Sequence, residues 1–184
     1  LEKRYKEKDS YLNQDYLNYK NIYGLSEAEL FQTLSDNPYQ DKDMRDTKVT
    51  VLRAYEPEHA WIVKRMMDCV NIINSMYYKF YLSNISDLQI LEYSENGHFD
   101  WHSDLGSGPM SSSRKLSIIV FLSDKSEYQG GNLIWNPSRP TDHGFSRNLG
   151  SFIIFPSFLE HKVTPLTKGK RNTLVAWIHG KPFK

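Results

Sequence analysis

The sequence predicts a mainly β protein with flanking helices, in which an antiparallel sandwich or jelly roll carries N-terminal helices packed outside it. Two observations support this fold class. An amphipathic helical pattern occupies residues 57–80, and from Leu88 onward the chain changes to short apolar runs separated by Gly, Pro, Asn and Asp. Many short strands after a helical start are typical of this architecture. The length of 184 residues fits one compact domain.

The first 54 residues contain three recognisable segments. Residues 1–24 are rich in Lys, Glu, Asn and Tyr without a clear period, and we interpret them as a solvated arm. Ser26 and Glu29 form a capping box that begins a short helix ending near Leu34. Residues 47–54 alternate apolar and polar side chains, which predicts a strand.

A long helix is expected next, because Pro57 suits the first turn of a helix and apolar side chains then recur at three- and four-residue steps. This apolar stripe consists of Val63, Met66, Val70, Ile73, Tyr77 and Phe80. Three methionines lie on or beside it, namely Met66, Met67 and Met76. We interpret the stripe as core rather than as a cofactor site, and we expect the helix to pack against a sheet.

Short apolar runs bounded by turn residues predict the strands of that sheet. The five main candidates are residues 88–93, 116–122, 132–135, 151–155 and 173–178, and two shorter ones are residues 97–102 and 161–164. Two polar loops, residues 105–113 and 137–147, are expected at a rim of the fold.

Composition excludes several functional classes. The 23 Lys and Arg residues nearly balance the 22 Asp and Glu residues, so a net charge of +1 provides no global field for nucleic acid or an anionic membrane. One cysteine, Cys69, permits no internal disulfide and no cysteine-rich zinc site. No apolar run approaches the ~20 residues of a membrane span. We expect a soluble, cytoplasmic protein, and the start at Leu1 is compatible with a removed leader.

Residues 97–104, with the sequence Gly-His-Phe-Asp-Trp-His-Ser-Asp, concentrate two histidines and two acids. In an extended strand, alternate side chains share one face, which here would hold His98, Asp100, His102 and Asp104. Two imidazoles and one carboxylate on one side of a metal leave positions open for substrate and oxygen. A local His-x-Asp supplies two such ligands, so the third must come from a distant strand.

His161 is the candidate for the third ligand, because it follows a strand and a turn and precedes another short strand. Taken alone, an ordinary core histidine explains this position equally well. Arg171 follows ten residues later, at the mouth of an apolar strand, where a guanidinium is a good partner for a carboxylate. The alternative for Arg171 is a surface charge like the neighbouring Lys168 and Lys170.

With these motifs the chain resembles the iron- and 2-oxoglutarate-dependent oxygenases, and within them the prolyl-4-hydroxylase-like branch that includes the bacterial PKHD-type hydroxylases. The segments that support the resemblance are Leu91–Tyr93, Arg114–Ser117, Phe121–Asp124, Gly130–Leu133, Gly150–Pro156 and His161–Pro165. The resemblance covers residues 85–180. It implies a single domain in which these residues form a double-stranded β-helix (jelly roll) core and residues 1–84 form a helical support.

By position, the resemblance implies that His102, Asp104 and His161 ligate Fe(II) and make up the catalytic centre. Because the family's order is His-x-Asp, His98 and Asp100 become second choices. The other histidines, His59, His143 and His179, are interpreted as structural or peripheral, and Glu160 is expected on the face opposite to His161.

The resemblance also implies a site for the cosubstrate 2-oxoglutarate. Arg171 would pair with its distal carboxylate, and Thr173 and Tyr93 would add hydroxyl contacts, although Tyr93 is equally compatible with an ordinary core position. Phe121 departs from the family pattern, because several relatives have a tyrosine there and phenylalanine has no hydroxyl.

The implied reaction uses O2 and 2-oxoglutarate, releases succinate and CO2, and hydroxylates a substrate, with ascorbate as a further cofactor. The favoured substrate is a prolyl residue in a peptide or protein, with a small molecule as another option. Trp101 and Trp135 are candidates for an aromatic groove, and the loop of residues 105–113 is a candidate lid. Two alternatives stay open. One is a nucleic-acid oxidative demethylase, whose longer Arg-Asn-Thr-Arg pattern is missing here, and the other is a non-catalytic, zinc-binding jelly roll.

Overall fold

The computed structural model describes residues 42–108, 110–135 and 146–183. These residues belong to one compact unit, Gln40–Lys184. The predicted arm at residues 1–24, the short helix at 26–34 and the histidine at position 143 lie outside the described residues. Among the residues described, no helix combines the length and apolar character that crossing a bilayer requires.

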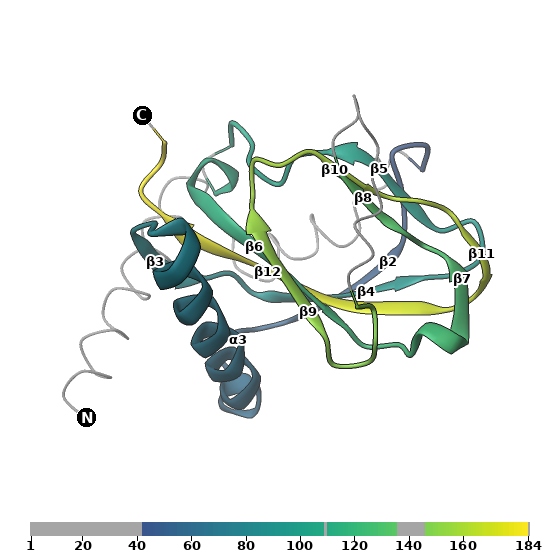
Figure 1. The fold of residues 1–184 in the computed structure, drawn as a ribbon, viewed down its shortest axis with the longest axis horizontal. Coiled ribbons are helices and arrows are strands. Elements are labelled where there is room, and N and C mark those ends of the chain that lie inside the picture. Colours follow the sequence, from purple (N-terminus) through teal and green to yellow (C-terminus); the bar gives the residue numbers. More distant parts are fainter. Residues whose placement is uncertain (1–41, 109, 136–145, 184) are drawn as a thin grey trace, which may run out of the picture. The chain divides into compact units, whose positions relative to one another are not determined.

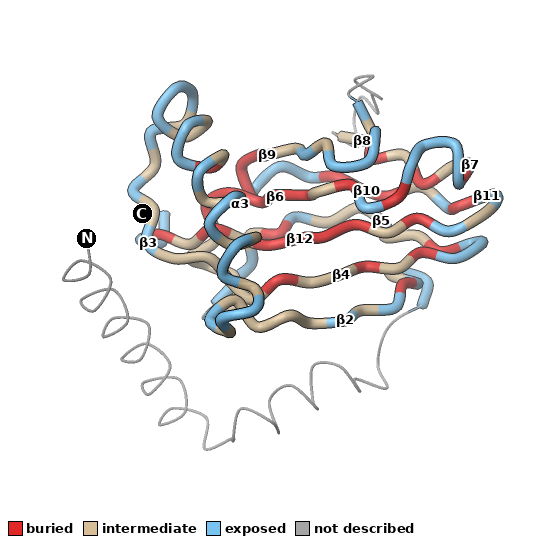
Figure 2. Tube along the Cα trace, turned by 90° about the horizontal axis from the view of Figure 1, so that it is seen from below, coloured by how far each residue is buried: buried red, intermediate tan, exposed pale blue. Residues whose placement is uncertain are grey.

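Two antiparallel sheets form the body of the molecule (Figures 1 and 2). The larger sheet has the strand order β2 (Lys48–Leu52), β4 (Leu88–Tyr93), β12 (Arg171–Gly180), β6 (Arg114–Phe121) and β9 (Phe152–Pro156), and β3 (Leu82–Ile85) also pairs with β12. The smaller sheet has the order β1 (Arg45–Asp46), β5 (His98–His102), β10 (His161–Val163) and β8 (Leu133–Trp135). A separate ribbon joins β7 (Tyr128–Gly130) to β11 (Leu166–Gly169). This arrangement confirms the prediction of a mainly β fold.

One helix, α3 (Ala60–Ile73), covers the outer face of the larger sheet (Figure 1). A 3-10 turn, η1 (Pro57–His59), leads into it, and a π-helical turn, η2 (Asn74–Tyr78), continues it. Two further 3-10 turns are η3 (Ser111–Ser113) and η4 (Lys125–Glu127). Met66 and Val70 of α3 are buried against the sheet, which confirms the predicted helix and its packing.

The prediction that the apolar stripe continues as core beyond α3 is wrong for Met76 and Tyr77, whose exposed fractions are 60% and 67%. The reason is the π-helical turn, because its wider turn rotates the later side chains away from the 3.6-residue stripe. Lys79 then ends the helix in the left-handed region, with φ of 53°.

The larger sheet is buried on both faces, and its strands sort their side chains by alternation. On β12, Leu174, Ala176 and Ile178 pack toward α3. The intervening residues point the other way, into the space between the two sheets, where Val175 joins Leu91, Ile119, Leu133 and Val163 in a core contributed by both sheets.

All seven strands that the sequence predicts after residue 85 are present, with each end shifted by two residues or fewer. The sequence did not predict β1, β3, β7 and β11, which contain between two and four residues and carry polar or glycine residues. Short strands of this kind form because a neighbouring strand pairs with them, not because of their own propensity.

Candidate active site

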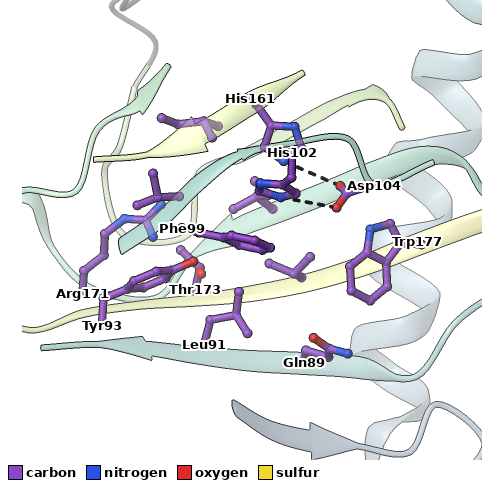
Figure 3. A pocket seen from close by; sticks show the side chains of 14 residues that line it. Gln89, Leu91, Tyr93, Phe99, His102, Asp104, His161, Arg171, Thr173 and Trp177 are labelled. Atoms are coloured by element: carbon purple, nitrogen blue, oxygen red, sulfur yellow. Dashed lines mark ion pairs between the residues drawn. The ribbon is translucent and has the colours of Figure 1, made fainter. Parts of the chain in front are cut away.

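A partly open pocket lies between the inner faces of the two sheets (Figure 3), with about 420 Å³ of space free of protein atoms when the open solvent at its mouth is included. One strand, β12, contributes four alternate lining residues, which are Arg171, Thr173, Val175 and Trp177. Alternation along a single strand therefore distributes a cation, a hydroxyl and an indole along the length of the pocket.

Three side chains able to bind a metal converge on one wall of the pocket (Figure 3). His102 ends β5, Asp104 follows two residues later, and His161 begins β10. His102 and His161 face each other because β5 and β10 pair with these two residues in register. One ligand atom from each of the three residues lies within 4.8 Å of the others. Nε2 of His102 is 3.7 Å from Asp104 Oδ1, and Nε2 of His161 is 3.8 Å from Asp104 Oδ2.

Backbone carbonyls determine which nitrogen of each imidazole is free. Nδ1 of His102 donates to the Asp100 carbonyl at 2.7 Å, and Nδ1 of His161 donates to the Leu159 carbonyl at 2.8 Å. Since a carbonyl only accepts, both protons lie on Nδ1 and the lone pairs on Nε2 face Asp104. Burial, and then the neighbouring His161, lower the pKa of His102 to about 4, so this imidazole is neutral at pH 7.

The Asp104 carboxylate is held by a buried hydroxyl that the sequence analysis did not identify. Ser117 of β6 donates to Asp104 Oδ2 at 2.6 Å, and its Oγ also lies 3.0 Å from the Oγ of Ser157. Ser117 and Ser157 have exposed fractions of 0%. A serine within the otherwise apolar stretch of residues 116–121 is the signal that could have pointed to it.

A bulge in β5 changes which of its residues reach the pocket. His161 pairs with His102, and Val163 pairs with Phe99. The two pairs are two positions apart along β10 but three positions apart along β5, so β5 contains one extra residue between them. As a result, Phe99 and His102 both line the pocket, with ring centroids 3.5 Å apart and planes 10° from parallel.

The prediction that four alternate residues of this segment share one face is therefore wrong. Asp100 is exposed, and neither it nor His98 lines the pocket. The two ring nitrogens of His98 lie 2.9 and 3.0 Å from the carbonyls of Asn96 and Asp43, which raise the pKa of His98. Strict alternation fails here because the bulge inserts one residue between the two inward side chains.

Arg171 lies at the opposite end of the pocket from Asp104 (Figure 3), with an exposed fraction of 1%. Its guanidinium carbon is 5.0 Å from the ring centroid of Tyr93 and 5.5 Å from that of Phe121. Nε and Nη1 are buried and have no hydrogen-bond partner among the described residues. Because an uncompensated buried cation is costly, this end of the pocket is suited to an anionic ligand.

Two hydroxyl-bearing residues accompany that guanidinium. Tyr93 of β4 pairs with Arg171 in register, and Thr173 follows two residues along β12. Burial raises the pKa of Tyr93, and the positive charges of Arg171 and Arg45 offset this only in part, so the hydroxyl keeps its proton. Phe121 is fully buried and contributes a ring without a hydroxyl.

The wall below Asp104 holds two residues that the sequence analysis did not single out, Gln89 and Trp177 (Figure 3). Nε1 of Trp177 is buried without a hydrogen-bond partner in the described part of the chain, and the guanidinium carbon of Arg114 lies 3.7 Å from its ring centroid.

The aromatic side chains of the pocket are not the two tryptophans that the sequence suggested. Trp101 and Trp135 do not line this pocket. Trp135 packs against the rings of Phe155 and His161, and Trp101 lies beside Lys162. The pocket's aromatic residues are Tyr93, Phe99 and Trp177, together with the imidazoles.

Residues 88–179, half of the 184-residue chain, match the 2OG-Fe(II) oxygenase superfamily. This chain belongs to that superfamily. It is 38% identical over 82 residues to a PKHD-type hydroxylase of Nitrosomonas europaea, covering 42% of this chain and 36% of the relative. It is 35% identical over 94 residues to a PKHD-type hydroxylase of Alteromonas mediterranea, covering 47% and 40%. The chain spans less than half the length of these curated relatives.

Solved structures of low sequence identity share the fold. A Pseudomonas putida prolyl-4-hydroxylase aligns with a TM-score of 0.62 at 16% identity over 83% of each chain. A viral collagen prolyl hydroxylase from Paramecium bursaria Chlorella virus-1, solved as a 2OG complex, aligns with a TM-score of 0.59 at 19% identity over 85% of this chain and 92% of its own. These alignments confirm the predicted double-stranded β-helix.

Proposed function

We propose that this protein is an Fe(II)- and 2-oxoglutarate-dependent dioxygenase that hydroxylates an unactivated C–H bond. The observation that carries the proposal is one pocket with three metal-binding side chains on one wall and, at the far end, a buried guanidinium with two N–H groups that have no partner among the described residues. Membership of the superfamily supports it. 2-Oxoglutarate suits such a pocket, because it has a carboxylate at each end and a keto group beside one of them.

The donor set fits Fe(II). Two imidazoles whose Nε2 atoms face Asp104, together with that carboxylate, make the two-histidine, one-carboxylate set that non-haem iron enzymes use, with coordination positions left open. Bound there, Fe(II) would supply the activation of O2 and the oxidation of the C–H bond, with release of succinate and CO2. His102, Asp104 and His161 would hold it, and the backbone bonds at both Nδ1 atoms would keep the imidazoles in the required tautomer.

The proposed role of Arg171 is to bind the distal carboxylate of 2-oxoglutarate through its unpartnered Nε and Nη1 donors. Tyr93 would donate its hydroxyl proton to the same carboxylate from the neighbouring strand, and Thr173 would add a second hydroxyl. We infer that Tyr93 thereby takes the place of the hydroxyl that Phe121 lacks. The rings of Tyr93 and Phe121 flank the guanidinium and exclude water from it.

Ser117 would act through Asp104. Its hydrogen bond to Oδ2, supported by Ser157, restricts the carboxylate to one orientation before any metal binds. Such outer contacts orient ligands and raise metal affinity.

The substrate that we propose is a prolyl residue of a peptide or protein, hydroxylated at C4. The support comes from structural neighbours that are prolyl hydroxylases. One structural neighbour with 17% identity and a TM-score of 0.57 is a Trichoplax adhaerens prolyl hydroxylase in complex with a peptide fragment of a hypoxia-inducible factor. In this chain, the indole of Trp177 and the amide of Gln89 offer an apolar face and hydrogen-bonding groups below the metal wall for such a residue.

The decisive experiment measures succinate release from 2-oxoglutarate with Fe(II), O2 and a panel of proline-containing peptides, free amino acids and methylated oligonucleotides. We expect a peptide to stimulate turnover, His161→Ala to abolish it, and His98→Ala, a histidine of β5 outside the pocket, to retain it. Anaerobic addition of Fe(II) and 2-oxoglutarate should produce a weak visible absorption band. Succinate formation at the wild-type rate by His161→Ala would show that the ligand assignment is wrong. Metal binding without succinate from any substrate would indicate a non-catalytic module.

A further inference from the structure

A second arginine, Arg45, lies on β1, which is the edge strand of the smaller sheet. β1 pairs with β5 so that Arg45 lies directly opposite Phe99. Directly opposed residues of an antiparallel pair place their side chains on the same face. Since Phe99 lines the pocket, Arg45 points to the pocket side of the sheet as well.

The contacts of Arg45 place its charge next to the candidate metal site. Its guanidinium carbon is 4.8 Å from the ring centroid of Phe99, and that ring stacks on the imidazole of His102. The charge of Arg45 also acts on Tyr93 and Asp104. Phe99 therefore contacts both the guanidinium and the imidazole of a candidate iron ligand.

Arg45 is partly buried, and no described residue compensates its charge. Burial lowers the pKa of Arg45, while the neighbouring Tyr93 and Asp104 oppose that shift. Within the part of the chain that the structure describes, its Nε is buried without a hydrogen-bond partner and no carboxylate lies within ion-pair distance of the guanidinium. This cation therefore resembles Arg171, for which a ligand has already been proposed.

The charges of the proposed complex leave Arg45 without a partner. Fe(II) and Arg171 together balance Asp104 and the 2-oxoglutarate dianion. One carboxylate of 2-oxoglutarate would face Arg171 and the other would lie at the metal, so neither remains for Arg45. Next to a partly desolvated site, an unbalanced positive charge favours an anionic group on the incoming molecule.

We propose that Arg45 binds a carboxylate of the substrate, and that the substrate of this enzyme is therefore acidic close to the carbon that is hydroxylated. The planar guanidinium can bind a carboxylate through two parallel hydrogen bonds. Two sources have this chemistry, namely the α-carboxylate of a free or C-terminal proline and the side chain of an acidic residue beside an internal proline. This inference rests on the proposed function and specifies its substrate.

The test compares ligands that differ only in charge, with the full chain loaded anaerobically with Fe(II) and 2-oxoglutarate. One pair is N-acetyl-proline and N-acetyl-prolinamide. The other pairs are capped proline peptides with Glu or Gln directly before or after the proline. Dissociation constants are measured by calorimetry for the wild type, Arg45→Met and Arg65→Met. Methionine keeps an unbranched apolar stem over Phe99, and Arg65 is an exposed arginine of α3 that serves as a matched control.

We expect the acidic member of at least one pair to bind roughly 10- to 100-fold more tightly than its amide in the wild type and in Arg65→Met. In Arg45→Met the two members should bind equally. The affinity of this variant for 2-oxoglutarate should differ from that of the wild type by no more than about twofold, because Arg45 does not contact the cosubstrate in the proposed complex. The pair that shows the preference identifies the source of the carboxylate.

Equal binding of both members of every pair by the wild type, including no binding by either, would overturn the proposal. A preference that survives in Arg45→Met would overturn it too, as would a loss of 2-oxoglutarate affinity in that variant, which would assign Arg45 to the cosubstrate. Failure of the wild type to bind 2-oxoglutarate at all is a separate result, because it rejects the proposed function itself.

Discussion

Replacing Arg171 with methionine should make the unliganded protein more stable and, at the same time, remove its affinity for 2-oxoglutarate. The guanidinium is 1% exposed, and Nε and Nη1 have no partner among the described residues. Each unsatisfied buried donor costs about 1–3 kcal/mol. Methionine fills the same space without polar atoms.

The substitution also removes the cation–π contacts of the guanidinium with the rings of Tyr93 and Phe121, which lowers the stability by about 0.5–2 kcal/mol for each contact. The difference predicts a gain of about 1–2 kcal/mol in the free energy of unfolding. For a chain of this size that corresponds to a melting temperature about 2–8 °C higher. Binding of 2-oxoglutarate should weaken by roughly 2–5 kcal/mol, or about 30- to 5,000-fold, because a charged partner is removed from a desolvated site.

Thermal unfolding with and without saturating 2-oxoglutarate, in the presence of the metal, measures both effects in one experiment. The wild type should melt higher when 2-oxoglutarate is added, because a ligand that binds only the folded state stabilises it. Arg171→Met should start higher and show no further increase, and Arg65→Met should behave like the wild type. If Arg171→Met melts well below the wild type without ligand, the arginine is a structural element and the argument from its unsatisfied donors is wrong.

Three further predictions concern the metal wall, pH and the backbone. Ser117→Ala should weaken Fe(II) binding about 10- to 100-fold in an anaerobic titration without changing the melting temperature of the apoprotein by more than a few degrees, because only the orientation of Asp104 is lost. Burial and then Arg114 lower the pKa of His179 to about 4, whereas an unfolded histidine titrates near 6.5, so the unfolded state binds more protons as the pH falls. The wild type should therefore lose up to about 3 kcal/mol more stability than His179→Gln between pH 7 and pH 4 in urea unfolding, and equal losses would contradict this. Gly169→Ala should lower the free energy of unfolding by about 2–4 kcal/mol, because φ is +82° and a Cβ would lie 2.1 Å from the carbonyl oxygen of Glu127. Gly150→Ala should lower it by only about 1–2 kcal/mol, because φ is similar, at +80°, but a Cβ there would meet open space.

Much of the fold could be predicted from local patterns, and six of the 14 residues that line the pocket could be proposed from those patterns together with the family resemblance. Strand β4 was predicted with its observed ends, and α3 was predicted from its apolar period, because alternation and a 3.6-residue repeat depend only on neighbours in the chain. His102, Asp104 and His161 could be proposed together because their order matches a family pattern. The structure brings these three into one pocket with Arg171, Tyr93 and Thr173.

Long-range pairing decided the rest. The bulge in β5, where that strand pairs with β10, places Phe99 beside His102 and turns Asp100 outward. Strict alternation would have put Asp100 and His102 on one face. Nothing near Arg45 in the sequence indicates that it lies on the same face of the sheet as Phe99, because that depends on which residue of β5 lies opposite.

The sequence by itself therefore determined the residue types that can carry the chemistry and the local elements that hold them. Only the tertiary structure decided that Arg171 is buried and Arg45 partly buried, both without a carboxylate partner among the described residues, and that Ser117 supports Asp104. The physical reason is that desolvation and hydrogen-bond satisfaction depend on what packs around a group, and those neighbours come from strands far apart in the chain.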